Sequence, residues 1–239
     1  MTTDALYGAV TRFAAATHML PEWVLNSEAW ACDAYEGVRY GFLHTTLELR
    51  QLAARLLAAR IQAGRPPTEA QHCLAQHQEA FRDLQSLLLG VDADLYRKQP
   101  APYEQALDTL IQHVHETERY FFGIIRNALD NPQPQPFDDE EQSAALAGEP
   151  VEIAHDGPPD AMWANLARLH AKVLQEFQGL SAEQLDSPAP AWEPEPWPDV
   201  RFRLHRFDAH LREHANQVEK NLLLLDQRPN EAKLLLRQM

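Results

Sequence analysis

The chain has 239 residues, of which 45% are hydrophobic and 23% charged, enough apolar material for one or two folded domains. Its formal net charge of −14 disfavours nucleic acid and anionic membrane surfaces as partners, because an acidic surface repels both. No apolar run is long enough to span a bilayer, and the first residues, MTTDALYGAVTRF, lack the basic start and apolar block of a signal peptide. Cys32 and Cys73 show no motif spacing, so we expect free thiols and a reducing, cytoplasmic location.

Scarce glycine and apolar residues recurring at helical spacing predict a nearly all-α chain. Proline-rich and glycine-containing breaks separate the periodic segments, as between the second and third helices at GRPP (64–67). The predicted helices, in chain order, cover 3–18, 30–63, 69–89, 103–129, 161–178 and 200–226.

The four later helices predict a four-helix bundle over 67–228, with the segment 130–160 as a long crossover between its second and third helices. Residues 1–66 form a helical extension outside this pattern, and 229–239 a C-terminal tail. The predicted helix 30–63 carries more apolar residues than an isolated surface helix needs, so we expect it to pack on the bundle or in a homodimer.

The last predicted helix contains three histidines within HRFDAHLREHANQVEK (205–220). At 100° per residue, His214 lies near the centre of the apolar stripe and His210 at its edge, whereas His205 points elsewhere. The i, i+4 spacing brings two imidazoles within reach of one cation. Two readings remain at this point, either a metal-ligand pair or two core histidines bonded to neighbours.

A third ligand is offered by the second bundle helix, where His113 and His115 flank the apolar stripe on opposite sides, so one ion could hardly bind both. The helical wheel does not choose between them. Glu118 lies on the apolar side of this helix. It could accept a hydrogen bond from a metal-binding histidine, bind the metal itself, or form a buried ion pair with an arginine such as Arg203.

Two further histidines lie on the apolar faces of their helices, His77 in AQHCLAQHQEAFRDL and His170 in MWANLARLHAKVLQEF. For each, a packed and hydrogen-bonded core histidine is the expected role.

At these motifs the chain resembles the DinB-like superfamily, which includes the YfiT-type proteins and thiol-dependent transferases. The segments LIQHVHETERYFF and VRFRLHRFDAHLREHANQVEK carry the resemblance, with His113 and Glu118 matching a His-x4-Glu motif and His210, His214 and Gln217 matching His-x3-His-x2-Gln. The resemblance covers about residues 69–226. It implies a four-helix bundle that holds a divalent ion, zinc or nickel, on three histidines, and it selects His113 over His115.

The site implied by the resemblance predicts a metal-dependent enzyme, of the thiol S-transferase or hydrolase type, acting on a small molecule, in the first case a low-molecular-weight thiol. Three neutral imidazoles with an open position are the arrangement of a catalytic metal, which lowers the pKa of a bound thiol or water. The alternative is a non-catalytic, stress-related bundle whose metal ties two helices together. The segment HLREHAN lacks the His-x3-His-x-Glu set of the iron-dependent sulfoxide synthases, which disfavours that oxidative chemistry.

Overall fold

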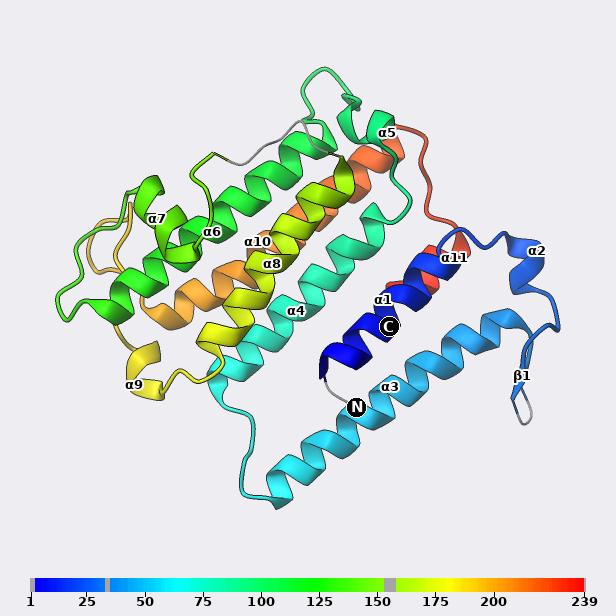
Figure 1. Ribbon diagram of the computed structural model, residues 1–239, viewed down its shortest axis with the longest axis horizontal. Coiled ribbons are helices and arrows are strands. Elements are labelled where there is room, and N and C mark those ends of the chain that lie inside the picture. The colour runs from blue at the N-terminus through cyan, green and yellow to red at the C-terminus, as the bar shows by residue number, and fades with distance from the viewer. Residues whose placement is uncertain (1–2, 33–34, 153–157, 239) are drawn as a thin grey trace. The chain divides into compact units, whose positions relative to one another are not determined.

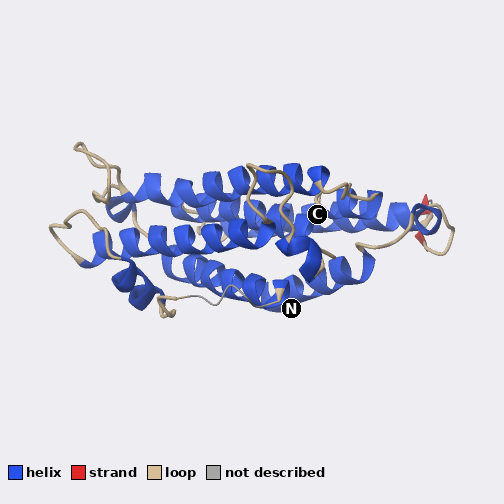
Figure 2. Ribbon diagram, turned by 90° about the horizontal axis from the view of Figure 1, so that it is seen from above, coloured by secondary structure: helices blue, strands red, loops and turns tan. Residues whose placement is uncertain are grey.

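The computed structural model describes residues 3–32, 35–152 and 158–238, and within these ranges nearly all regular structure is helical (Figure 2). The all-α class is thus confirmed, with one minute antiparallel pair of strands as the exception. The elements are α1 (Thr3–Thr17), α2 (Glu22–Leu25), β1 (Ala31–Cys32), β2 (Tyr35–Glu36), α3 (Val38–Gln62), α4 (Glu69–Leu88), α5 (Ala93–Arg97), α6 (Leu107–Asp130), α7 (Glu140–Ala147), α8 (Pro159–Phe177), α9 (Ala182–Leu185), α10 (Val200–Leu224) and α11 (Glu231–Leu236). No described helix has both the length and the apolar character needed to cross a membrane.

The chain divides into two compact units. The bundle unit comprises Thr68–Leu84 and Val91–Leu225, and the terminal unit comprises Met1–Pro67, Gln85–Gly90 and Asp226–Met239. The terminal unit therefore contains segments from both ends of the chain.

In the bundle unit, the long helices α4, α6, α8 and α10 lie side by side (Figure 1), with α6 packed against both α8 and α10. Their inward faces form one apolar core, in which Phe121, Phe177 and Phe207 are almost fully buried. Burying an aromatic side chain of this size stabilises the fold by roughly 2–3 kcal/mol.

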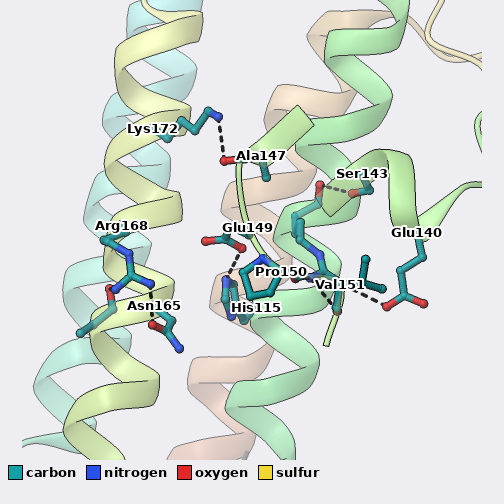
Figure 3. A network of polar contacts seen from close by, with 12 residues as sticks. His115, Glu140, Ser143, Ala147, Glu149, Pro150, Val151, Asn165, Arg168 and Lys172 are labelled. Carbon is teal, nitrogen blue, oxygen red and sulfur yellow. Dashed lines mark hydrogen bonds and ion pairs between the residues drawn. The ribbon is translucent and has the colours of Figure 1, made fainter. Parts of the chain in front are cut away.

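The crossover between α6 and α8 contains a two-turn helix, α7. A buried arginine of α6 forms hydrogen bonds that hold the crossover against α6. The guanidinium of Arg119, 1% exposed, donates to the carbonyl oxygens of Pro150 and Val151 at 2.8 and 3.1 Å and to Glu140 at 3.0 Å. Figure 3 shows the same segment held from the α8 side, where Lys172 donates to the Ala147 carbonyl at 2.7 Å. These bonds satisfy backbone groups that an unsupported crossover would leave unpaired.

The terminal unit packs α3 against α2 and α11, around a small core that includes Leu25, Phe42 and Leu235. Arg39 of α3 forms a two-pronged ion pair with Glu231 at the start of α11, one prong measuring 2.7 Å. The segment predicted as a tail thus contains a packed helix, Glu231–Leu236.

The predicted start of the second helix at residue 30 is wrong, because α3 begins at Val38. Residues 31–32 pair with 35–36 as two short antiparallel strands, and Gly37 follows with φ of +98°, a conformation that ends any helical path through it. A second glycine, Gly90, follows α4 with φ of +73°, and a Cβ there would lie 2.8 Å from the His18 imidazole. Cys73 is a buried free thiol, as expected, whereas the side chain of Cys32 lies outside the described residues.

Candidate metal centre

Two of the three histidines of α10 share its buried face. His210 and His214 are 4% and 5% exposed, and their Nε2 atoms lie 2.9 Å apart. His205 is exposed and contacts the Cys73 thiol, with 3.5 Å between Nε2 and Sγ. The helical spacing therefore separates the pair from the third histidine, as predicted.

Helix α6 brings His113 to this pair. The His113 ring lies 5.5 Å from the His210 ring and 5.0 Å from the His214 ring, centroid to centroid, and one nitrogen of each residue lies within 4.8 Å of the others. His113 is exposed while the other two are buried, so the cluster has one side open to solvent. Within the part of the chain that the structure describes, this is the one group of three or more histidine, cysteine, aspartate or glutamate side chains whose ligand atoms lie close enough to bind a single metal ion.

His115 faces away from the cluster. Its Nε2 lies 2.9 Å from a carboxylate oxygen of Glu149 in the crossover, and Figure 3 shows the two side chains facing each other beside α6. The structure therefore places His113 beside the α10 pair and gives His115 a different partner.

Hydrogen bonds fix how His214 presents its ring. Its Nδ1–H donates to Oε1 of Gln217 at 2.6 Å, which leaves the lone pair of Nε2 directed at His210. Two imidazole nitrogens 2.9 Å apart share either the N–H hydrogen of one neutral ring or a metal ion, because two facing lone pairs repel each other. Burial lowers the pKa of His214, and it lowers the pKa of His210 to about 3, with the neighbouring histidines acting in the same direction. Both rings are therefore neutral near pH 7, which is the form that binds metals.

Glu118 lies behind His210 and is 1% exposed. One carboxyl oxygen lies 3.6 Å from Nδ1 of His210, and the other lies 3.5 Å from Nε2 of His77. Burial raises the pKa of Glu118 well above its usual range. At 3.6 Å the carboxyl oxygen and Nδ1 do not form a hydrogen bond, so Glu118 lies behind His210 as a buried polar group facing the ring nitrogen that is turned away from the cluster.

The ion pair between Glu118 and Arg203, one of the three readings of this residue, does not form. Arg203 binds both carboxylate oxygens of Glu193, at 2.7 and 2.6 Å, and the Ala189 carbonyl. Glu118 is also not a member of the three-histidine cluster. Its place behind His210 is the reading that fits these contacts.

The polar chain continues from Glu118 into the core through the two remaining inward histidines. Nε2 of His77 lies 2.9 Å from Nδ1 of His170, whose Nε2 lies 2.9 Å from the amide oxygen of Gln78. The His170 ring also stacks on Phe81, with centroids 3.9 Å apart. Both histidines have the packed, hydrogen-bonded role expected of them. The link between them and Glu118 had no sequence signal, because it joins three helices.

The comparison with protein families agrees with this geometry. The model of the family described as the DinB superfamily matches residues 74–218, which run from α4 to α10 and include all three clustered histidines. The chain belongs to the DinB superfamily. No curated protein and no solved structure matches it. Membership of the DinB superfamily and the three-histidine cluster together fit a site that could hold a divalent metal ion.

Proposed function

We propose that this DinB protein binds one divalent metal ion, zinc or nickel, through His113, His210 and His214, and uses it as an enzyme. The observation that carries the proposal is the convergence of three imidazole nitrogens within 4.8 Å on a site with one exposed side. Structural zinc sites close all four positions with protein ligands, whereas catalytic sites use three and keep one open.

The chain's own residues would prepare this site in three ways. Gln217 holds His214 with its Nε2 lone pair inward, Glu118 stands behind His210, and exposed His113 leaves a side through which a small molecule can reach the ion. The ion itself would supply Lewis acidity, lowering the pKa of a coordinated thiol or water.

Thiol transfer is the first candidate reaction and hydrolysis the second, with a low-molecular-weight thiol as the preferred small-molecule substrate. A nucleophile from the chain itself is poorly supported, because burial and the neighbouring Glu69 raise the pKa of the Cys73 thiol. A thiolate or hydroxide brought to the metal does not need one.

A non-catalytic role is the alternative, in which the metal ties α6 to α10. The near-complete burial of two of the three histidines favours it, since burial limits approach to the ion from the α10 side. The two functions differ in whether an exchangeable ligand reaches the metal.

The test begins with metal analysis of protein purified without a histidine tag. His214→Ala should lose the bound ion, while His115→Ala and His205→Ala, which change histidines outside the cluster, should retain it. Loaded protein is then assayed for conjugation of glutathione, cysteine or coenzyme A to 1-chloro-2,4-dinitrobenzene. Stoichiometric metal without turnover of thiol or ester substrates would favour the non-catalytic role. Absence of any bound divalent ion, even after incubation with zinc or nickel, would refute both.

A further inference from the structure

Arg206 of α10 is a cation beside the histidine cluster that has no anionic partner. Its guanidinium lies over the Phe121 ring of α6, 5.6 Å from the ring centroid. The Phe121 ring in turn contacts the His210 ring, with centroids 5.6 Å apart. Among the residues that the structure describes, Arg206 forms no hydrogen bond and no ion pair.

The lack of a partner sets Arg206 apart from the rest of its helix. The three other arginines of α10 each bind a carboxylate: Arg201, Arg203 and Arg212. Arg203 and, more weakly, Arg206 lower the pKa of Glu193, but both carboxylate oxygens of Glu193 are bound to Arg203. The N–H donors of Arg206 therefore stay available to a ligand.

Helical geometry places Arg206 at the open side of the cluster. It precedes His210 by four residues, so the two share one face of α10 and lie one turn apart, about 6 Å along the axis. Arg206 is partly exposed, and His113 is exposed on the facing helix α6. A small molecule that reaches the cluster from solvent at this edge therefore passes close to the guanidinium.

We propose that Arg206 binds a carboxylate of the substrate, so that the preferred substrate of the metal site is a small thiol that carries a carboxylate. This inference rests on the proposed function, because it needs a metal ion on the three histidines to hold the sulfur. A guanidinium pairs with a carboxylate through two parallel N–H···O bonds, and the single charge of Arg206 balances the single charge of a carboxylate.

The charges on the two sides of the cluster would orient such a molecule. Burial is the main cause that lowers the pKa of both His210 and His214. Arg206 adds to this effect at His210, whereas Glu213 opposes it at His214. A carboxylate is therefore attracted to the His210 side of the cluster and repelled from the His214 side.

The experiment compares two small thiols on zinc-loaded protein by isothermal titration calorimetry. One is 3-mercaptopropionate, which carries a carboxylate, and the other is 2-mercaptoethanol, which does not. The ratio of the two affinities should be about tenfold lower in Arg206→Gln than in wild type, the size expected when a charged hydrogen-bond partner is lost. Comparing ratios between proteins cancels the intrinsic difference between the thiols. Arg212→Gln, which removes the same charge from another face of α10, should keep the wild-type ratio.

The zinc content of each protein is measured first, and circular dichroism melting confirms that each is folded. Arg206→Met, whose apolar stem can still pack on Phe121, should show the same fall and replaces the glutamine variant if that variant is unfolded. A wild type that binds no zinc would refute the metal site and this inference with it. Zinc-loaded wild type that binds neither thiol, or a ratio that Arg206→Gln and Arg206→Met leave unchanged, would overturn the role of Arg206 alone. An equal fall in Arg212→Gln would overturn it too, because net charge would then be the cause.

Discussion

Acidification should destabilise the metal-free protein, because its core buries histidines in their neutral form. Burial lowers the pKa of His170 and His210 from 6.5 to about 3, and lowers that of His77 well below 6.5. The unfolded chain therefore takes up protons first as pH falls through 6.5. The contribution of these buried neutral histidines to the free energy of unfolding is complete above pH 6.5 and is lost progressively below it.

The size of the effect follows from these shifts. At pH 5, His170 and His210 each cost roughly 2 kcal/mol relative to neutral pH, at about 1.4 kcal/mol per pH unit below 6.5. His77 acts in the same direction. Glu118 acts in the opposite direction, because its raised pKa lets the folded state hold a proton that the unfolded state releases above about 4.5. His170 and His210 together therefore cost about 4 kcal/mol, a large share of a typical 5–15 kcal/mol, while His77 and Glu118 act in opposite directions.

Urea denaturation at pH 7 and pH 5 in the presence of a chelator measures this loss. The His170→Asn variant should lose about 2 kcal/mol less than wild type between the two pH values, since one buried histidine is gone. His72→Gln, which changes an exposed histidine on α4, should lose as much as wild type. The reasoning would be refuted by equal losses in wild type and His170→Asn, or by a wild-type stability that does not fall with pH.

Three further predictions concern the metal site and the terminal unit. Replacing Glu118 with glutamine should weaken metal binding about 10–100-fold in a competition titration, because a group behind a ligating histidine is lost; an unchanged affinity would show that Glu118 does not position His210. Copper should bind more tightly than nickel, and nickel more tightly than manganese, as equilibrium competition can determine, and tightest binding of manganese would contradict nitrogen ligation. Deleting residues 1–66 should expose Leu235 of α11 and lower solubility, and an unchanged melting temperature and oligomer size would count against this packing.

The sequence was sufficient for the long helices and for part of the site. Apolar spacing predicted α6 and α10, and the helical wheel alone placed His210 and His214 on one buried face. The choice between His113 and His115 needed the family resemblance, because both flank the apolar stripe of α6. What separates them is a contact with Glu149 in the crossover, 34 residues along the chain, which no local pattern reveals.

Long-range contacts also explain what the sequence analysis missed. The strand pair before α3 joins two strands of two residues each, too short to give an alternating pattern. Helix α11 has only six residues, too few to be stable alone, and is held by α3 and by the ion pair between Arg39 and Glu231. Both features form only when tertiary partners are present, so their sequences read as loop and tail.

The make-up of the terminal unit imposes an order on folding during synthesis. Residues 1–67 leave the ribosome before the bundle unit, yet the helix that completes their core, α11, is made only after the whole bundle unit. At 5–20 residues per second, the wait is roughly 8–30 s. Through that interval the core around Phe42 lacks the part of its cover that α11 supplies, while the bundle unit has every segment it needs. We therefore expect nascent chains to pass through a state with a folded bundle and an exposed N-terminal region, the form most open to chaperones and proteases.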